Sequence, residues 1–159
     1  EDDFIDKDLT MRDYLTEIIS SFKEFSKKNF IFNFNQDLNF RKITKSIEIV
    51  YGLRNFIGNA NKFSKDTIYI NLRSNKEITE ITIEDDGNGY PRDVLSKIGE
   101  PYLKSNDPIK KSKEGLGLGL FIGKTLLEKN FASINCRNSK TRGGAEVIIK
   151  WKNRELFNI

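Results

Sequence analysis

The sequence has no histidine among its 159 residues and a single cysteine, Cys136. Any chemistry that needs a histidine side chain must therefore take it from outside this chain. One cysteine excludes an internal disulfide and a cysteine cluster for zinc. Cys136 falls in a predicted strand, where a small buried apolar residue is the simplest interpretation and a redox role is the alternative.

A long hydrophobic run is also absent. No apolar stretch approaches the ~18 residues of a membrane-spanning helix. The acidic start, Glu1-Asp2-Asp3, is not that of a signal peptide, which begins with positive charge. Because the first residue is not methionine, we expect a fragment whose parent protein can still carry membrane segments.

The composition is that of an ordinary globular protein, with 37% hydrophobic and 31% charged residues. The length suits one domain with its own core. A net charge of +4 raises the question of nucleic acid binding, but the lysines are scattered, with one denser run at residues 110–113. We expect no direct contact with nucleic acid; a solvated basic surface, or a charge suited to a phosphate ligand or an acidic partner, explains the excess.

Hydrophobic periodicity predicts helices and strands in mixed order. The predicted long helices are Met11–Lys28 with Thr10 as N-cap, Ser46–Phe63 and Leu116–Asn130. The predicted strands are Asn29–Asn35, Thr67–Leu72, Ile78–Glu84, Ala132–Asn138 and Ala145–Trp151. We expect a short helix from Pro91 to about Ile98 and a loop over Gly99–Glu114. This mixture predicts an α+β fold, a two-layer α/β sandwich in which helices cover one face of a mixed sheet.

The second predicted helix has two different faces. At about 100° per residue, one side carries the apolar stripe Ile49, Leu53, Phe56 and Ala60. Asn55, Asn59 and Lys62 project together from another arc. Amide oxygens can coordinate Mg²⁺, and an ammonium can neutralise phosphate. For this helix alone, an ordinary solvated face is the simpler interpretation.

Two glycine-containing blocks follow. In Asp85-Asp86-Gly87-Asn88-Gly89, a carboxylate at a strand end can accept from an amino group such as that of adenine, and the glycines let a ligand approach the backbone. An Asx-rich turn is the alternative. Residues 115–120, with alternating glycines, lead into a helix and leave backbone N–H groups free for phosphates. This block lacks the Gly-Lys-Ser/Thr ending of a P-loop, and no strand precedes it as in a dinucleotide fingerprint.

In this order and spacing, the three blocks resemble the nucleotide site of the Bergerat-fold ATPases, the superfamily of gyrase, Hsp90, MutL and the sensor histidine kinases. Leu53–Phe63 is similar to the histidine kinase N box, Asp85–Gly89 to the G1 box and Gly115–Leu120 to the G2 box. Gly143-Gly144-Ala145 lies at the place of a G3 box. The resemblance covers about residues 46–151 and implies the catalytic, ATP-binding domain of a sensor histidine kinase.

The resemblance also implies roles by motif position. Asn59 corresponds to the Mg²⁺ ligand and Asp85 to the residue that binds the adenine amino group. Phe63 would lie beside the nucleotide, and Lys62 near the phosphates. Asn55 and Lys62 are the expected catalytic residues. Residues 99–114 would form a lid over the triphosphate. The other expected ATP contacts are Asn55, Gly87, Gly89, Lys104, Gly115, Leu116, Gly117, Leu118, Gly119 and Leu120.

One position separates the subfamilies. Hydrolytic relatives and the anti-sigma serine kinases typically place a glutamate one helical turn before the Mg²⁺-binding asparagine, where it acts as a general base. Here that position is Asn55, which cannot accept a proton at neutral pH. A histidine acceptor already has a nucleophilic ring nitrogen, so Asn55 favours a histidine kinase. Intact Asn59, Asp85 and G2-like glycines argue against the further alternative, a nucleotide-binding pseudokinase.

Two segments depart from the common histidine kinase pattern. Residues 98–104 replace a phenylalanine-rich F box and, with residues 115–128, resemble the redox-responsive RegB/PrrB group. Ala145 stands where the G3 box commonly has threonine, so a hydroxyl that could help hold adenine through water is missing.

The resemblance finally implies an organisation. Residues 1–9 would link to an upstream dimerisation and phosphoacceptor domain, residues 10–152 would form the catalytic domain, and residues 153–159 would be a tail. Since this chain has no histidine, the acceptor lies on the other domain and the isolated domain is inactive as a kinase. A response regulator is the expected downstream partner. The domain would be cytoplasmic, with membrane contact only through a parent protein anchored in the inner membrane.

Overall fold

The computed structural model describes residues 9–35, 41–43, 46–98 and 116–157. Its helices are α2 (Met11–Lys23), α3 (Ile47–Phe63), α4 (Arg92–Lys97), α6 (Leu116–Glu128) and α7 (Asn153–Leu156). Its strands are β1 (Leu9–Thr10), β2 (Asn29–Phe34), β3 (Lys42–Ile43), β4 (Thr67–Ser74), β5 (Ile78–Asp85), β6 (Ser133–Asn138) and β7 (Ala145–Lys152).

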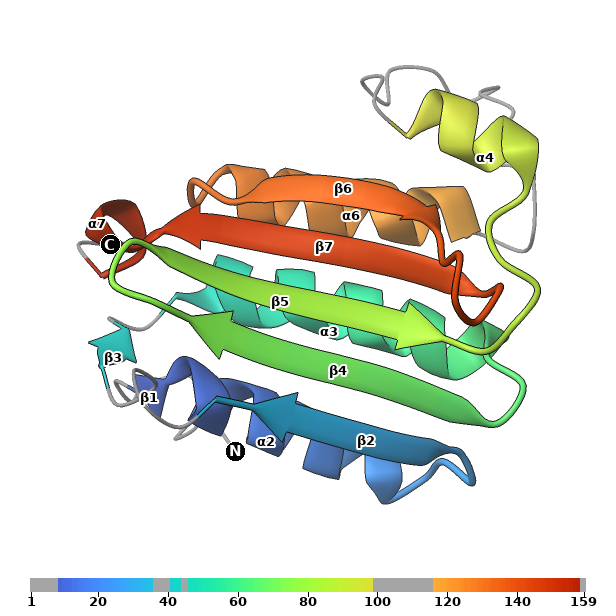
Figure 1. The fold of residues 1–159 in the computed structure, drawn as a ribbon, viewed down its shortest axis with the longest axis horizontal. Helices are drawn as coiled ribbons and strands as arrows, with labels where there is room; N and C mark the ends of the chain where they lie inside the picture. Colours follow the sequence, from blue (N-terminus) through green and yellow to red (C-terminus); the bar gives the residue numbers. More distant parts are fainter. Residues whose placement is uncertain (1–8, 36–40, 44–45, 99–115, 158–159) are drawn as a thin grey trace.

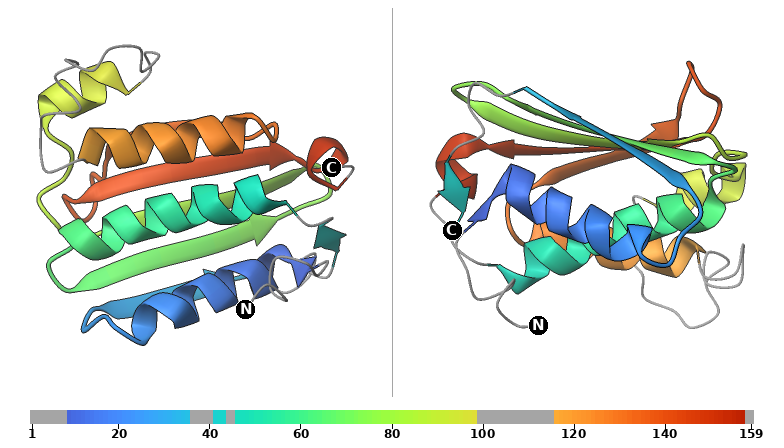
Figure 2. Two further views of the ribbon diagram at one scale, coloured as in Figure 1. Left: turned by 180° about the vertical axis from the view of Figure 1, so that it is seen from behind. Right: turned by 90° about the horizontal axis from the view of Figure 1, so that it is seen from below.

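Five strands form one mixed sheet in the order β2-β4-β5-β7-β6 (Figure 1). β2 is parallel to β4, and the other neighbours are antiparallel. Helices α2, α3 and α6 lie side by side on one face of this sheet (Figure 2). The predicted two-layer α+β fold is confirmed. None of the helices in the described residues is long and apolar enough to cross a membrane.

The hydrophobic core lies between the sheet and these three helices. Alternate residues of the central strands face it, because successive side chains of a strand point to opposite faces. They are Ile68, Ile70 and Leu72 in β4, Ile81 and Ile83 in β5, and Val147, Ile149 and Trp151 in β7. The only tryptophan, Trp151, is 1% exposed, and its indole N–H donates to the carbonyl of Asn130, just after α6 (3.0 Å).

Two of the long helices begin at side-chain caps. The Thr10 hydroxyl accepts from the Asp13 N–H of α2 (3.1 Å), as the sequence predicts, and the Ser46 hydroxyl accepts from the Ile49 N–H of α3 (3.2 Å). The predicted apolar stripe of α3 is buried throughout. The amphipathic pattern therefore places this helix with its polar arc away from the sheet.

Helices α3 and α6 contact each other through two glycines. A Cβ atom on Gly52 would lie 2.6 Å from Cγ of Leu127, and one on Gly123 would lie 2.8 Å from Cε2 of Phe56. Relaxed carbon–carbon contacts are about 3.5–4.0 Å, so the helices approach this closely because neither position has a side chain. The contact sets the spacing between the N-box-like and G2-box-like blocks, which these two helices carry.

Helix α2 ends at Lys23, earlier than the predicted end at Lys28. The residues beyond it bind the end of α3 instead. The Ser26 hydroxyl donates to the Asn61 side chain (2.6 Å), and the Lys28 ammonium donates to the carbonyls of Asn61 and Ser64 (2.7 Å each). These tertiary hydrogen bonds override a helical period that continues in the sequence.

The expected tail, residues 153–159, begins with helix α7, which packs against the domain. Helix α7 contributes Leu156, fully buried, to the core, and Asn153 is only 5% exposed. The Asn153 amide donates to the Asn75 carbonyl and accepts from the Thr79 hydroxyl (2.7 Å each). A four-residue helix is too short to show a period in the sequence.

We expect Gly52→Ala and Gly58→Ala, identical changes in α3, to affect stability in opposite directions. At Gly58 the new methyl group makes ordinary contacts with the Phe22 ring, at 3.4 Å from Cζ and 3.7 Å from Cε1, so the higher helix propensity of alanine should raise the free energy of unfolding by up to about 1 kcal/mol. At Gly52 the methyl group meets the Leu127 side chain, and overpacking should lower the free energy of unfolding by roughly 1–3 kcal/mol. Urea denaturation measures both. Equal effects would show that the α3–α6 contact relaxes without cost.

Candidate functional site

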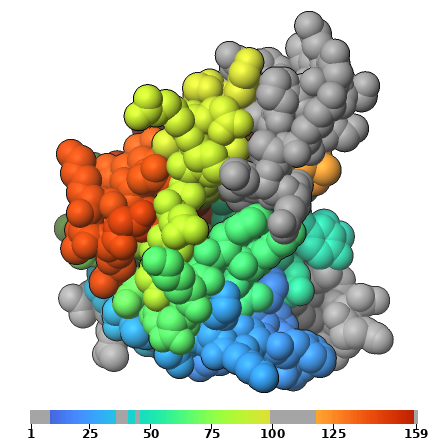
Figure 3. All heavy atoms as spheres, turned by 90° about the vertical axis from the view of Figure 1, so that its right-hand side faces the viewer, coloured from blue at the N-terminus to red at the C-terminus, as the bar shows by residue number. Residues whose placement is uncertain are grey.

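A cavity of about 360 Å³ lies between α3, strands β5 and β7, and the loop after β5. That loop, yellow-green in Figure 3, lies against the orange β6–β7 hairpin. The cavity is mostly apolar with a few polar side chains, as is typical of a small-molecule site. It is lined by Phe56, Asn59, Ala60, Phe63, Ile83, Asp85, Asn88, Gly89, Tyr90, Pro91, Ala145 and Val147.

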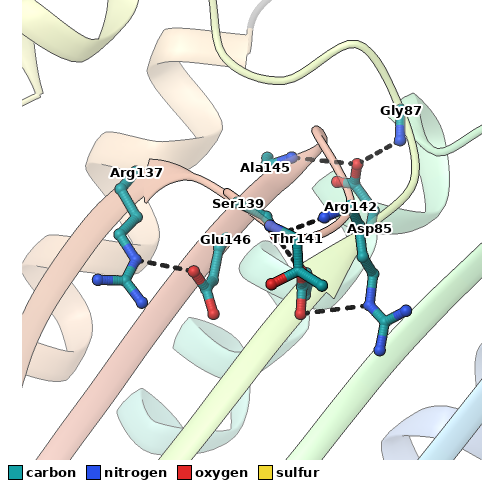
Figure 4. A network of polar contacts seen from close by, with 9 residues as sticks. Asp85, Gly87, Arg137, Ser139, Thr141, Arg142, Ala145 and Glu146 are labelled. Carbon is teal, nitrogen blue, oxygen red and sulfur yellow. Dashed lines mark hydrogen bonds and ion pairs between the residues drawn. The ribbon is translucent and has the colours of Figure 1, made fainter.

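Asp85 ends strand β5 and is the buried carboxylate of this cavity, with 3% of its surface exposed. Its Oδ1 accepts from the backbone N–H of Gly87 (2.8 Å) and of Ala145 (3.3 Å) (Figure 4). Burial raises the pKa of Asp85, and these two hydrogen bonds offset only part of that effect. Within the described chain both donors reach Oδ1, so Oδ2 is left for a ligand that can donate.

Two glycines allow the backbone to close around Asp85. A Cβ atom on Gly87 would lie 2.2 Å from the carbonyl oxygen of Phe63, and one on Gly144 would lie 2.0 Å from that of Asp85. Neither position can therefore hold any other residue without moving the backbone. The glycines of the G1-like and G3-like blocks serve this close approach.

The neighbouring Asp86 has a structural role. Its carboxylate accepts from the N–H groups of Lys65 (2.9 Å), Asp66 (3.0 Å) and Thr67 (3.2 Å). Burial acts to raise the pKa of Asp86, but the hydrogen bonds outweigh it and lower the pKa overall. Asp86 thus holds the turn between α3 and β4, beside the cavity residue Phe63.

Asn59 lies on the cavity wall where α3 meets α6. Its Nδ2 is the one buried side-chain nitrogen or oxygen among the described residues that has no hydrogen-bond partner. A Cβ atom on Gly119 would lie 3.0 Å from this amide, so a glycine there makes room for it. A buried amide that the protein leaves unsatisfied indicates a bound partner.

Other predicted residues of α3 differ in their surroundings. Phe63 lines the cavity. The Lys62 ammonium is exposed and lies 5.3 Å from the centre of the Phe63 ring. The Asn55 amide donates to the Tyr51 carbonyl of its own helix (2.8 Å). Neither Asn55 nor Lys62 is among the cavity-lining residues.

The G2-like block is helical where the structure describes it. Helix α6 begins at Leu116, so Gly117 and Gly119 lie in its first turn. The first four N–H groups of a helix have no partner within it and can bind anions. Leu118 is half-buried, and the side chain of Leu120 is fully buried in the core, so only its backbone could meet a ligand. Lys104, Gly115 and the expected lid lie outside the described residues.

Comparison with known families shows which family this chain belongs to. Residues 44–155 match the family described as histidine kinase-, DNA gyrase B-, and HSP90-like ATPase. The chain belongs to this ATPase family. It is a catalytic ATPase domain of the kind found in sensor histidine kinases, as its relatives indicate.

The sensor histidine kinase RegB of Cereibacter sphaeroides is 37% identical over 102 residues, which are 61% of this chain and 22% of RegB. The sensor protein SrrB of Staphylococcus aureus is 31% identical over 98 residues, 60% of this chain and 17% of SrrB. The chain thus spans less than a quarter of the length of these relatives. The catalytic domain of the histidine kinase ThkA has the same fold, with a TM-score of 0.70 and 19% identity over 92% of this chain and 94% of that domain.

The ATPase domain brings four predicted residues together at the cavity: Asn59, Phe63, Asp85 and Gly89. The apolar residues that complete the lining were not predicted as site residues. Alternation along the strands could have found two of them. Ile83 lies two residues before Asp85 in β5 and so points to the same face of the sheet, and Val147 of β7 is the cross-strand partner of Ile83.

Tyr90 was also missed, although it directly follows the G1-like block. It is 7% exposed, lines the cavity and interacts with Cys136 of β6. Burial raises the pKa of Cys136 to about 12, and the hydrogen bond with Tyr90 lowers it only in part. The thiol stays protonated at neutral pH, which argues against a thiolate-based redox role for Cys136.

We expect Asp85→Asn and Asp86→Asn to shift the stability of the ligand-free domain in opposite directions at pH 7. The raised pKa of Asp85 means that its charged form opposes folding, so the neutral amide should raise the melting temperature. The lowered pKa of Asp86 means that its charged form favours folding, so its replacement should lower the melting temperature.

Acidification distinguishes these effects from simple packing changes. As the pH falls through the folded pKa of Asp85, wild type takes up a proton there and the advantage of Asp85→Asn should shrink. The stabilising charge of Asp86 is lost as the pH falls through its folded pKa, so the deficit of Asp86→Asn should shrink as well. Thermal melts from pH 7 to about pH 2 measure both trends, because the folded pKa of Asp86 lies below the usual aspartate value of about 3.9. A lower melting temperature for Asp85→Asn at pH 7 would contradict the assignment.

Proposed function

We propose that this domain binds ATP with Mg²⁺ and presents the γ-phosphate to a histidine on a separate domain of a two-component sensor kinase. The observation that carries the proposal is the buried carboxylate of Asp85 in a mostly apolar cavity. The backbone N–H groups of Gly87 and Ala145 offset only part of the cost of burying this carboxylate, so a ligand that donates to it from the cavity would be favoured. The membership in the ATPase family supports a nucleotide as the ligand.

Adenine fits the chemistry of this cavity. Its exocyclic amino group would donate to Oδ2 of Asp85, because the backbone N–H groups of Gly87 and Ala145 both donate to Oδ1. The apolar surfaces of Ile83 and Val147 and the rings of Phe63 and Tyr90 would contact the base. At the G3 position, Ala145 supports the base indirectly, through the N–H that it donates to Asp85.

Asn59 would hold the Mg²⁺ ion, with other ligands from phosphates and water. Its Nδ2 has no partner among the described residues, so the amide is not committed to the protein and can turn its oxygen to the cavity. The residues that the structure describes contain no group of three or more aspartate, glutamate or cysteine side chains that could hold a metal ion. When bound, Mg²⁺ neutralises charge on the β- and γ-phosphates.

The first turn of α6 would bind the phosphates through its free N–H groups. The turn includes Gly117 and Gly119, and Gly119 lies against Asn59, so the phosphate and metal subsites adjoin. Lys62 and, from the lid, Lys104 would add positive charge. The expected contacts of Gly115, Leu116, Leu118 and Leu120 would be made by the backbone.

Asn55 favours a histidine as phosphate acceptor. Its amide donates to the Tyr51 carbonyl and cannot take a proton from water or a serine hydroxyl. A neutral imidazole nitrogen attacks without such a base. Positioning of the γ-phosphate and stabilisation of its charge would then supply most of the catalysis.

We further propose the setting that relatives suggest. Residues 1–9 would connect to the dimerisation and phosphoacceptor domain, and the compact ATPase domain would extend beyond residue 152 to include α7. A response regulator would receive the phosphoryl group. The domain would lie in the cytoplasm, with any membrane anchor in the rest of the parent protein. The identity with RegB supports the expected kinship with that group.

Calorimetry with ATP and Mg²⁺ should show one site per chain, and Asp85→Asn should weaken ATP by about 1.5–3 kcal/mol, the range for a hydrogen bond to a charged group. Inorganic triphosphate has no amino group, so its affinity should change little. Equal losses for both ligands would make Asp85 a structural residue. No heat and no thermal shift with saturating nucleotide would refute the proposed function.

We expect the isolated domain neither to label itself with the γ-phosphate nor to hydrolyse ATP rapidly, because it has no histidine and Asn55 is no base. Adding the parent's phosphoacceptor domain should restore acid-labile labelling of that domain. Rapid phosphate release that Asn59→Ala abolishes would instead favour the hydrolytic members of the family. Labelling of a serine in a partner would favour the anti-sigma kinases.

A further inference from the structure

The cavity wall formed by the loop after β5 is held by one side chain of β6. Asn138 Oδ1 accepts from the backbone N–H of Tyr90 (2.6 Å), and Asn138 Nδ2 donates to the carbonyl of the same residue (3.2 Å). One amide therefore satisfies both backbone groups of Tyr90, as a neighbouring strand would. The two segments lie in contact in the space-filling view (Figure 3).

Two further contacts bring this loop to the β6–β7 hairpin. Cys136 lies on the same face of β6 as Asn138 and interacts with the buried side chain of Tyr90. A Cβ atom on Gly89 would lie 2.8 Å from Asn138 Oδ1 and 3.1 Å from the carbonyl oxygen of Gly143. The loop therefore has no room to move closer to the hairpin, and the Asn138 amide prevents it from moving away.

The hairpin itself is fixed on the opposite face of the sheet. The Ser139 hydroxyl donates to the Glu84 carboxylate, and it accepts from the N–H of Thr141 (3.2 Å) and of Arg142 (3.0 Å) (Figure 4). The Arg142 guanidinium lies 3.5 Å from Glu84 and 3.6 Å from the ring centre of Tyr69. Asn138 thus extends from a rigid support.

We infer that Asn138 is a positioning residue for the base-binding part of the cavity, acting through Tyr90. The inference rests on the proposed function, since it takes the cavity beside Asp85 and Tyr90 as the adenine site. Tyr90 and its neighbours Asn88, Gly89 and Pro91 form one wall of that cavity. Loss of the Asn138 amide would release this wall while leaving the α6 side, where the phosphates would bind, unchanged.

The test compares Asn138→Ala with the matched control Asn135→Ala in the same strand. Both residues are exposed, so neither change creates a core cavity, and Asn135 pairs with Ile148 of β7. Calorimetry of Asn138→Ala should give an ATP Kd about tenfold weaker with a stoichiometry near one, as expected if the released wall is in its binding-competent position about one tenth of the time. The Kd for inorganic triphosphate should stay within about twofold, and Asn135→Ala should match wild type for both ligands.

Two additional measurements separate positioning from folding. In the ligand-free protein, amide exchange of Tyr90 should be faster in Asn138→Ala than in wild type, at temperatures well below melting. Asn138→Asp keeps an acceptor for the Tyr90 N–H but sets its second oxygen against the Tyr90 carbonyl, so it should weaken ATP at least as much.

Equal weakening of ATP and triphosphate would overturn the inference, and so would a reduced stoichiometry with an unchanged Kd, which indicates partial unfolding. An Asn138→Ala variant that binds ATP like wild type would overturn the inference alone. Failure of the wild-type domain to bind ATP would refute the proposed function itself.

Discussion

The buried carboxylate of Asp85 is the group on which the rest of the site depends. A charged oxygen in an apolar cavity is tolerated only where hydrogen-bond donors reach it, and here the donors are the backbone N–H groups of Gly87 and Ala145. Bringing both to one oxygen requires β7 beside β5, a tight turn after β5, and no side chain at Gly87 or Gly144. The residual cost of burial, visible in the raised pKa, is the part that a ligand can relieve.

The end of β5 connects the two faces of the sheet. Strand alternation directs Asp85 to the cavity and Glu84 to the opposite face. Glu84 binds Ser139 and Arg142 of the β6–β7 hairpin, and the same hairpin supplies the Ala145 N–H to Asp85. The polar contacts on the open face of the sheet therefore determine the geometry of an apolar site on the covered face.

Periodicity and turn chemistry predicted most of the fold, because burial alternates along the central strands and helices α2 and α3 are amphipathic. The glycine blocks likewise predicted which segments converge on the cavity. The different roles of Asp85 and Asp86 could not be predicted, since two adjacent carboxylates differ only in what surrounds them. Nor could the link from Asn138 to Tyr90, which joins segments 48 residues apart and has no local pattern. The early end of α2 depends in the same way on a tertiary partner, through Lys28.

Trp151 gives this domain a built-in optical reference. It is the only tryptophan, and it lies in the core near the end of β7, whereas Ala145 at the other end lines the cavity. At about 3.3 Å per residue, the indole is on the order of 20 Å along the strand from Ala145 and on the order of 13 Å from Val147, which also lines the cavity. Its hydrogen bond to the Asn130 carbonyl ties its emission to the packing of α6 against the sheet. Its emission, excited selectively over the five tyrosines, therefore reports loss of the core, and nucleotide binding would appear in it as a higher unfolding midpoint.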